Sequence, residues 1–431
     1  MKIICDISIL GRHRMTGVPR VIEEITRGLF YHPECELIFC ADKNSYLYAK
    51  KYLESIDYFS GYTLSKPDTI LPFLFLTSCI RSSSGRIKEL KSIIKNGGRH
   101  KFILKAGKEL LNYTRKGAGF FIISDISRKD LMSADIYHLM YPNLPRYVRR
   151  YDNLSFFQTI HDIIPILCPQ YIPDGSGRLI KSYINWLAEK DFLLCVSNST
   201  RNDLLNYNRK VNPDRVFVTH LAVSGKFCPC ESPEEIERVK RKYKIPKGSR
   251  YILSVATFDP RKNLDILIRS FVRLIELERI SDLSLVLVGR LGWGYEKIFQ
   301  EIEDNSGVRD RIIITGYVDD VDLSPMYTGC LAFVYPSAYE GFGLPPLEAM
   351  ACGAPVITSN TSSLPEVVGG AGIMVAPGDA DGLSEAICKI CRSESLRQDM
   401  SRRSLERAKL FSWEKCVDQT VAAYKKALAM K

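Results

Sequence analysis

The sequence lacks an apolar run long enough to cross a bilayer, and its first residues do not resemble a secretory leader. The longest apolar run, Ile70–Leu76, is far shorter than the roughly 18 residues that a span requires, and it contains a proline. The first apolar segment, Lys2–Leu10, is short and has Asp6 inside it. We therefore expect a cytoplasmic protein that at most binds peripherally to the cytoplasmic face of a membrane.

A metal-binding or disulfide pattern of cysteines is also lacking, although there are 13 cysteines. Cys228 and Cys230 stand close together, but one such pair does not make a zinc site. Free thiols in a reducing compartment are our interpretation. The composition, with 45% hydrophobic and 25% charged residues, excludes wholesale disorder. The length of 431 residues predicts two domains, because single cores stop growing below that size.

A general excess of positive charge is lacking too, despite a net charge of +11. Residues 81–116 hold eleven basic and two acidic residues, which is +9 of that total. The rest of the chain is nearly neutral, so the protein is not a polycation. A nucleic-acid binder could use this segment, but Phe102 and Tyr113 are its only aromatic residues, and stacking needs more.

Strand-like apolar runs alternate with helical patterns along most of the chain, which predicts α/β domains with parallel, doubly wound sheets. The predicted strands are Lys2–Leu10, Glu36–Cys40, Ile136–Leu139, Ser155–Ile160, Leu193–Ser197, Val216–Thr219, Tyr251–Ala256, Ser284–Val288, Ile312–Thr315, Leu331–Tyr335, Pro355–Thr358 and Gly372–Val375. The predicted helices include Val18–Phe30, Gly177–Lys190, Ser199–Leu205, Asn263–Leu277 and Asp381–Cys391.

The alternation breaks between Val223 and Arg250, where prolines and glycines punctuate a charged stretch. We predict a first domain over 1–225, with a basic insertion at about 80–116, and a second over 226–410. Residues 411–431 are predicted to form a C-terminal helix that packs back on the first domain. Ligands of such folds bind at the carboxyl ends of strands and at domain interfaces, so we expect a central cleft.

The richest motif lies at Tyr335–Met350, where a strand runs into a Gly- and Pro-rich turn and Leu347 is predicted to begin a helix. Gly341 and Gly343 allow a ligand to approach the backbone, and helix-start amides face the same space. Glu340 and Glu348 flank the turn, and such a site could hold sugar hydroxyls. The alternative is an ordinary strand–helix loop with solvated glutamates.

Three further segments could contact a ligand. Arg261 and Lys262 stand near a helix start after the second domain's first strand, where a phosphate would be favoured, or they are a solvated pair. His161 ends a strand and could donate to a substrate oxygen, or it is a structural histidine. Gly17 lies in the loop from the first strand to the first helix and would let a phosphate approach.

Two motifs are weaker. Gly289–Gly294 lacks the third glycine of a dinucleotide fingerprint at the proper spacing. Asp320-Val321-Asp322 has an Asp-x-Asp spacing seen in some metal-binding transferases. It stands where the chain enters a predicted helix, Leu323–Tyr327, so we interpret it as an N-cap.

Together these residues resemble a known family. Glu340 and Glu348, with the Gly-Phe-Gly-Leu-Pro-Pro turn between them, are similar to the E-x7-E motif of the family 4 retaining glycosyltransferases, which have the GT-B fold of two Rossmann-like domains. The resemblance covers nearly all of Arg250–Ala408. One departure is Thr257, where many members carry an arginine; we expect Arg261 to supply that charge.

The resemblance implies a nucleotide-sugar donor held by the second domain and an acceptor bound mainly by the first. Glu340 and His161 would lie at the transferred sugar, and Glu348 would bind the ribose. The donor-binding residues that it implies are Gly17, Arg261, Lys262, Val318, Gly341, Phe342, Gly343, Leu344 and Glu348. The phosphate-binding cations make a metal or other cofactor unnecessary, so we expect none.

The Asp259–Asn263 pattern resembles a branch rich in mannosyltransferases of bacterial surface polysaccharides, such as O-antigen or capsule. That implies transfer of mannose from GDP-mannose to a lipid-linked or polysaccharide acceptor. Other UDP-, dTDP- or GDP-sugars, such as those of glucose or rhamnose, stay open. A sugar phosphorylase would need a pyridoxal phosphate lysine, which we do not find, and a non-catalytic nucleotide- or nucleic-acid-binding protein is the remaining class.

The resemblance also suggests a role for the basic segment, residues 81–116. Lysines of residues 88–108 recur at helical spacing, with apolar residues between them. We predict that residues 81–116 bind the anionic inner-membrane surface, where a lipid-linked acceptor would be found, and that nucleic acid is not a partner.

Overall fold

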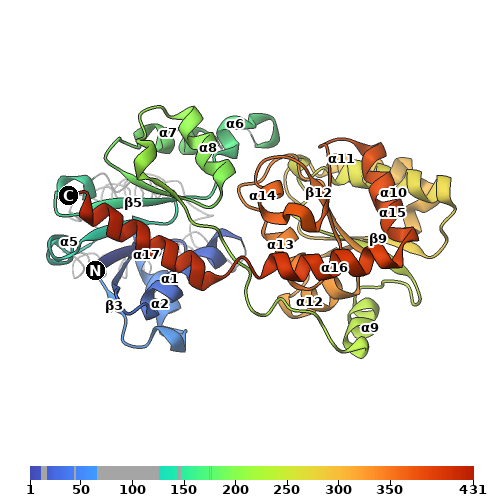
Figure 1. Cartoon of the computed structure of the whole chain (residues 1–431), viewed down its shortest axis with the longest axis horizontal. Coiled ribbons are helices and arrows are strands. Elements are labelled where there is room, and N and C mark those ends of the chain that lie inside the picture. Colours follow the sequence, from blue (N-terminus) through green and yellow to red (C-terminus); the bar gives the residue numbers. More distant parts are fainter. Residues whose placement is uncertain (11–16, 43–44, 66–125, 143–146, 174, 176) are drawn as a thin grey trace, which may run out of the picture. The chain divides into compact units, whose positions relative to one another are not determined.

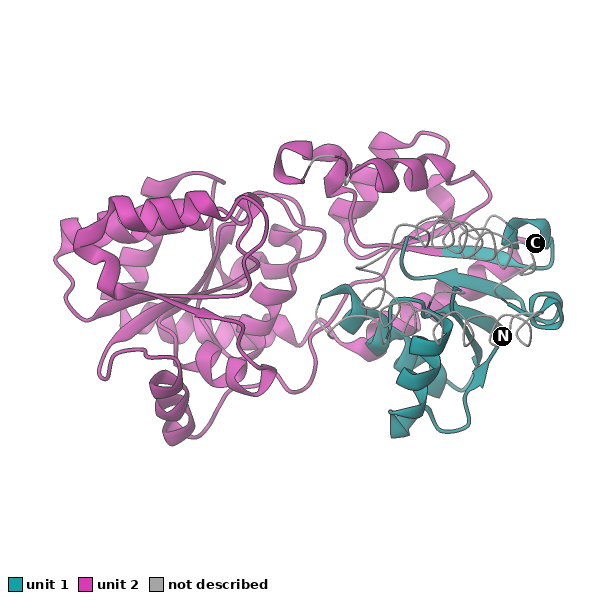
Figure 2. Ribbon diagram, turned by 180° about the vertical axis from the view of Figure 1, so that it is seen from behind, with its two compact units in different colours: residues 1–157 teal, residues 158–431 magenta. Residues whose placement is uncertain are grey.

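The computed structural model describes residues 1–10, 17–42, 45–65, 126–142, 147–173, 175 and 177–431. The described chain divides into two compact units, residues 1–157 and 158–431 (Figure 2). The division falls inside a strand, Ser155–Ile160, so the domain boundary at residues 225 and 226 stays a prediction. In the part of the chain that is described, no helix has both the length and the apolar character to cross a membrane. The basic segment 81–116 lies outside the described residues.

The first sheet has seven strands in the order β3-β2-β1-β4-β5-β6-β7, and its pairings β1–β2, β1–β4, β2–β3 and β6–β7 are parallel. The strands are β1 (Lys2–Asp6), β2 (Glu36–Cys40), β3 (Thr63–Leu64), β4 (Ile136–Leu139), β5 (Ser155–Ile160), β6 (Phe192–Cys195) and β7 (Val216–Val218). The helices of this part are α1 (Val18–Tyr31), α2 (Tyr46–Glu54), α5 (Arg128–Ser133), α6 (Ile164–Leu167), α7 (Gly177–Trp186) and α8 (Asn198–Tyr207).

Strand β1 ends earlier than its apolar run predicts. The Asp6 carboxylate accepts hydrogen bonds from the backbone N–H and the hydroxyl of Ser8, at 2.9 and 2.5 Å. This side chain-to-backbone contact turns the chain directly after Asp6. The predicted strand to Leu10 is therefore wrong in its last four residues, although Ile7 and Leu10 are buried as its apolar character implies.

The second sheet has six parallel strands in the order β10-β9-β8-β11-β12-β13. They are β8 (Arg250–Val255), β9 (Leu283–Val288), β10 (Ile312–Gly316), β11 (Ala332–Tyr335), β12 (Val356–Ser359) and β13 (Ile373–Val375). Counted from β8, this is the 3-2-1-4-5-6 order of the doubly wound Rossmann fold, and the two sheets confirm the predicted architecture. The order reverses between β8 and β11, so the loops after these strands diverge and leave room for a ligand.

Nine helices are described after residue 225: α9 (Pro233–Lys242), α10 (Leu264–Glu278), α11 (Glu296–Asp304), α12 (Asp320–Gly329), α13 (Leu344–Ala351), α14 (Leu364–Val368), α15 (Ala380–Arg392), α16 (Glu394–Ala408) and α17 (Trp413–Ala429). Helices α10 and α15 lie side by side in Figure 1. Their apolar faces and strands β8, β9, β11 and β12 form one buried cluster. This core holds β8 and β11, whose carboxyl ends carry the predicted donor residues.

Helix α9 lies within the charged stretch that we interpret from sequence as a domain boundary. The Ser232 hydroxyl caps it by accepting from the Glu235 N–H, and Pro233 occupies its first turn, where no N–H partner is needed. The Pro- and Gly-rich composition therefore marks the ends of a helix here as well as loops.

The N-cap interpretation of Asp320 and Asp322 is wrong. Helix α12 begins at Asp320 with Asp319 as its N-cap, and Asp322 is fully buried inside the first turn. Its carboxylate accepts from Arg238 at 2.7 Å and from Lys242 at 2.5 Å. Because both cations come from α9, Asp322 fastens two helices together.

The last helix, α17, lies within the predicted range 411–431 and begins after Ser412, whose hydroxyl accepts from the Lys415 N–H. Near its end, the Lys426 ammonium lies over the Phe217 ring of β7, 5.3 Å from the centroid. Packing of this helix on the whole predicted first domain stays a prediction.

Candidate active site

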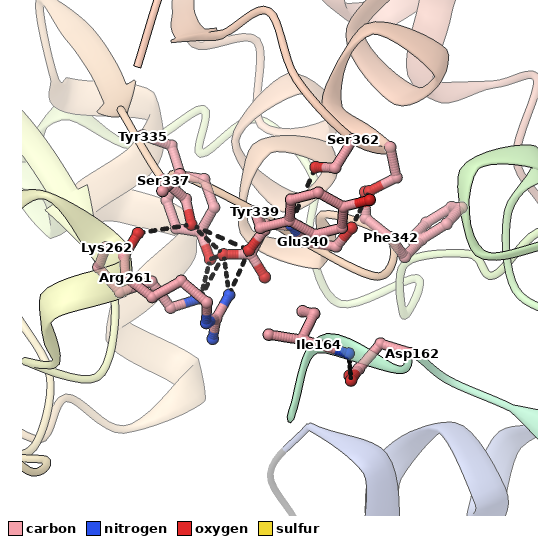
Figure 3. Close-up of polar contacts among 12 residues, drawn as sticks. Asp162, Ile164, Arg261, Lys262, Tyr335, Ser337, Tyr339, Glu340, Phe342 and Ser362 are labelled. Carbon is pink, nitrogen blue, oxygen red and sulfur yellow. Dashed lines mark hydrogen bonds and ion pairs between the residues drawn. The ribbon is translucent and has the colours of Figure 1, made fainter. Parts of the chain in front are cut away.

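Four donors converge on one oxygen of Glu340, five residues after the end of β11 (Figure 3). Its Oε1 accepts from Lys262 Nζ and Ser337 Oγ, each at 2.5 Å, and from the Tyr335 hydroxyl at 3.0 Å. The Arg261 guanidinium forms an ion pair with the same oxygen at 2.7 Å. The carboxylate is buried, so these partners hold it as a charged group in a fixed position.

The charges at this cluster shift the pKa of each member. Burial would raise the pKa of Glu340, but Lys262 and Arg261 lower it to about 2. Burial lowers the pKa of the Lys262 ammonium despite the opposing charge of Glu340. Glu340 raises the pKa of Arg261 although burial acts in the other direction. Asp259 also interacts electrostatically with both cations, so the cluster holds two basic side chains among acidic ones.

The two cations follow β8, and the glutamate follows β11. Arg261 and Lys262 belong to a short 3-10 helix, Pro260–Lys262, that leads into α10. Strands β8 and β11 are the neighbours at which the strand order reverses, so parallel geometry brings both loops to the same edge. The fold thus joins two motifs that are nearly 80 residues apart in sequence. The predicted role of the cations in binding a diphosphate stays a prediction.

The turn after Glu340 is held in place by its glycines and by hydrogen bonds. A Cβ at Gly341 would overlap the His161 carbonyl oxygen and lie 2.9 Å from Asp162 Cβ, so only glycine fits. Gly343 has a φ of +119° and is the N-cap of α13. Phe342 is buried, and its backbone carbonyl accepts from Ser363 Oγ at 2.5 Å.

Helix α13 begins at Leu344, three residues before the predicted start. Pro345 and Pro346 lie in its first turn, which proline tolerates because those positions need no N–H partner. The earlier start places Glu348 in the second turn, where Oε2 accepts from the Tyr327 hydroxyl at 3.0 Å. Glu348 is therefore oriented by α12 and is half-buried. Its predicted contact with ribose stays a prediction.

His161 and Asp162 follow β5 and lie next to this turn. The Asp162 carboxylate accepts from the Ile164 N–H at 3.0 Å, as Figure 3 shows, and burial raises its pKa. His161 is half-buried, and its backbone carbonyl faces Gly341. The His161 backbone and Asp162 therefore lie against the Glu340 turn, and the predicted place of His161 at the transferred sugar stays a prediction.

Val318 and Gly17 are the other two predicted donor residues. Val318 is buried directly after β10, beside the half-exposed Tyr317, whose ring lies 4.7 Å from the Arg290 guanidinium carbon. Gly17 belongs to the first unit, where it is the N-cap of α1 with a φ of +56°, and no atom of the described residues beyond its chain neighbours lies within 4 Å of an added Cβ. The predicted approach of a phosphate to Gly17 stays a prediction.

Sequence reasoning missed the contacts that helix α8 makes with this turn. Ser197 and Thr200 donate to the Gly341 carbonyl at 2.7 and 3.1 Å, and Asp203 accepts from the Tyr339 hydroxyl. It also missed Ser337 and Tyr335 as partners of Glu340. A polar residue directly after a strand end was the only signal, and it is too common to have singled these residues out.

A second missed cluster surrounds Glu366, in α14. The carboxylate accepts from the Asn198 N–H at 2.9 Å and contacts His220 Nε2 at 2.5 Å. Burial opposes the charged form, but His220 and Asn198 lower the pKa of Glu366. The His220 ring also packs edge-on against Phe411, with centroids 5.9 Å apart. These contacts join α8, α14 and the segment before α17.

The chain matches the family described as "Glycosyl transferases group 1" over residues 235–407. It is 40% identical over 270 residues to O-antigen chain mannosyltransferase B of Escherichia coli, across 62% of this chain and 69% of that protein. It is 34% identical over 274 residues to the serotype-specific mannosyltransferase WbdA of Escherichia coli, across 62% of this chain and 33% of that relative. The chain thus spans about a third of the length of WbdA.

Solved structures agree in fold. A glycosyltransferase from Rickettsia africae matches 100% of this chain with 99% of its own length, at a TM-score of 0.66 and 18% identity. Anabaena Alr3699/HepE in complex with UDP and glucose matches 99% of this chain with 100% of its own length, at a TM-score of 0.65 and 16% identity. The predicted GT-B class is therefore confirmed.

Sequence and fold lead to the same family, and the resemblance to family 4 enzymes and to bacterial surface-polysaccharide mannosyltransferases is confirmed. The chain belongs to the glycosyl transferases group 1, and it is a glycosyltransferase with the GT-B fold.

Proposed function

We propose that the protein transfers mannose from GDP-mannose, with retention at the anomeric carbon, to a lipid-linked or polysaccharide acceptor of a bacterial surface glycan. The observation that carries the donor site is the convergence of Arg261, Lys262 and Glu340 at the switch point of the second sheet. Mannose as the sugar is supported by the names of the Escherichia coli relatives.

The donor would lie along the carboxyl ends of β8 and β11. Arg261 and Lys262 bind the diphosphate, and the α13 amides after Gly343 add positive potential. Glu340 and the backbone of residues 341–344 hold the mannose hydroxyls. Glu348 accepts from the ribose hydroxyls while Tyr327 orients it. In this proposal the Val318 backbone meets the base, Gly17 approaches the diphosphate, and His161 lies against the transferred sugar.

Donor binding would exchange partners within the cluster. In the structure both cations are paired with Glu340 Oε1, and Arg261 also donates to the Tyr339 carbonyl at 2.6 Å. A diphosphate carries more charge than one carboxylate, so it draws the cations toward itself. Ser337 and Tyr335 keep Glu340 in place and charged during that exchange.

The proposed reaction breaks the bond between the anomeric carbon and the β-phosphate oxygen and forms a bond from that carbon to the acceptor oxygen on the same face. The departing diphosphate oxygen takes the proton of the acceptor hydroxyl, so the products are the glycoside and protonated GDP. Arg261 and Lys262 stabilise the charge that develops on the leaving group. We propose that no metal ion or other cofactor takes part.

A panel of nucleotide sugars tests the donor. GDP-mannose, UDP-glucose and dTDP-rhamnose are compared by thermal shift and then by turnover on lipid-linked acceptors. We expect the largest shift and turnover with GDP-mannose, and full activity in EDTA. Turnover of UDP-glucose alone would overturn the donor, and activity lost in EDTA and restored by magnesium would overturn metal independence.

The site of action is proposed to be the cytoplasmic face of the inner membrane. This rests on sequence alone, because the +9 segment, residues 81–116, is attracted to anionic lipid. Replacing Lys88, Lys91, Lys101 and Lys105 by glutamine should reduce binding to anionic liposomes and leave turnover of a soluble acceptor unchanged. Unchanged liposome binding would contradict this proposal.

A further inference from the structure

Helix α8 touches the turn of the candidate donor site at three points along its first two turns. Ser197 is its N-cap, Thr200 lies one turn on, and Asp203 lies one turn further. All three side chains are directed to residues 339–341, on both sides of Glu340. We propose that α8 positions this turn for catalysis, and that Asp203 and Tyr339 are the positioning residues that act through Arg261. The proposal rests on the donor site described under the proposed function.

The first contact chain runs from Asp203 to Arg261. The Tyr339 hydroxyl lies 2.9 and 2.8 Å from the two Asp203 oxygens, so it donates to the carboxylate from a central position. The carbonyl of Tyr339 in turn accepts from the Arg261 guanidinium at 2.6 Å. One residue therefore links the helix to the cation that is expected to face the leaving group. If the tyrosine ring loses its anchor, the carbonyl that orients Arg261 is free to move.

The second contact chain ends on Gly341. Its carbonyl accepts from Ser197 Oγ at 2.7 Å and from Thr200 Oγ1 at 3.1 Å. The Ser197 hydroxyl also accepts from the Thr200 N–H at 3.0 Å, so it caps the helix and holds the turn at the same time. Helix capping thus fixes the direction of the hydroxyl that meets the turn.

These bonds hold the turn in addition to the close packing of Gly341. The hydrogen of Gly341 faces the His161 carbonyl, and a Cβ would not fit there. Residues 339 and 341 are the neighbours of Glu340, whose Oε1 forms ion pairs with both Arg261 and Lys262. A site residue must be held to within a fraction of an ångström, and a rigid helix does this better than a loop alone. The three contacts of α8 provide that support.

The decisive variants remove single groups without disturbing the core. Tyr339→Phe deletes only the hydroxyl, Asp203→Ala deletes its acceptor, and the double variant deletes both. Asp203→Asn keeps one acceptor oxygen and is the conservative rescue. Asn206→Ala is the matched control, because Asn206 is exposed on the same helix. None of these residues is placed among the groups that bind the donor.

With GDP-mannose as the donor, we expect kcat/KM to fall about tenfold in Tyr339→Phe and equally in Asp203→Ala, because a small misplacement near the reacting atoms has effects of this size or larger. The fall should lie mainly in kcat. The double variant should be no worse than either single variant, Asp203→Asn should regain most of the activity, and Asn206→Ala should keep all of it. Wild-type kinetics in all variants, or additive losses of kcat/KM in the double variant, would overturn the proposal.

A second measurement does not depend on the donor. The denaturation midpoint of the wild type, the two single variants and the double variant is measured in urea, and the hydrogen exchange of residues 335–344 is followed by mass spectrometry. We expect non-additive midpoints and faster exchange of this segment in both single variants. Additive midpoints with unchanged exchange would overturn the positioning role. If the variants show this non-additivity but the wild type does not use GDP-mannose, only the proposed donor fails.

Discussion

Asp322 and Glu340 are both buried carboxylates, and each is paired with an arginine, a lysine and a tyrosine, yet they lie in different regions of the fold. Asp322 accepts from Arg238 and Lys242, whose side chains are 40% and 46% exposed, on the outside of α9. Water therefore already solvates these cations. The Asp322 cluster lies where α9 packs against the start of α12, the helix that follows β10.

The cations of Glu340 are in the opposite situation. The side chains of Arg261 and Lys262 are only 16% and 9% exposed, and both follow the carboxyl end of β8. Burying these charged groups is costly, and shifted pKa values of buried charged groups cluster at functional sites. The comparison teaches that the types of residue in an ion cluster do not identify a site. The two clusters differ in how exposed their cations are and in which elements supply them.

The largest expected difference is in activity after neutralising each carboxylate. Glu340→Gln should lower kcat/KM by about 100-fold or more, because it removes a group expected to hold the sugar and leaves two cations misdirected. Asp322→Asn should leave kcat/KM unchanged and reduce the free energy of unfolding by about 1–3 kcal/mol, because three donors lose a charged acceptor. Steady-state kinetics and urea unfolding of both variants measure this. Normal turnover by Glu340→Gln would disprove the assigned donor site.

The lysines of the two clusters offer a second, matched pair. Lys262→Met should weaken GDP binding about tenfold to 100-fold, since a buried cation aimed at a diphosphate is lost. Lys242→Met, the control of equal chemistry, should bind GDP like the wild type because Lys242 faces water. Isothermal titration with GDP measures both constants. Equal affinities for GDP in the two variants would remove the distinction drawn between the clusters.

Glycines beside Glu340 and at the end of α12 extend the comparison to shape. Alanine at Gly341 would meet the backbone of His161, which cannot move without moving β5, so we expect about a tenfold loss of kcat/KM. Alanine at Gly329, in α12, would lie 2.6 Å from Ile236 Cγ2 and 2.9 Å from the Tyr251 hydroxyl, which are side-chain atoms. Its expected effect is a loss of about 1–3 kcal/mol in stability at full activity. Kinetics beside thermal unfolding separates the two outcomes.

The smallest expected effect is a loss of folding stability at acidic pH. The pKa of Glu340 is lowered from 4.5 to about 2, so its carboxylate stabilises the fold above pH 4.5 and this contribution is lost as the pH falls to about 2. The free energy of unfolding of the wild type should therefore approach that of Glu340→Gln over this window. Urea unfolding at a series of pH values measures the difference. A difference that stays constant down to pH 2 would show that the ion cluster does not depend on a charged Glu340.

Much of the architecture was predictable because apolar periodicity reports burial on parallel strands. Strands such as Glu36–Cys40 and Ser155–Ile160 lie where they were predicted. One error arose where a local polar contact overrides periodicity, because Asp6 turns the chain after β1. The other arose from a distant contact, because Asp322 pairs with a neighbouring helix instead of capping its own. A single sequence does not report which distant cation a buried aspartate will meet.

For the candidate site, the sequence by itself determined the types and spacing of the groups: two cations after one strand, two glutamates separated by seven residues after another, and glycines in the turn between them. Only the tertiary structure decided that Lys262 and Arg261 meet Glu340 and that Asp203, 136 residues earlier in the chain, holds Tyr339. The physical reason is that hydrogen-bond partners follow from strand order and helix packing. These bring together residues between which no local pattern exists.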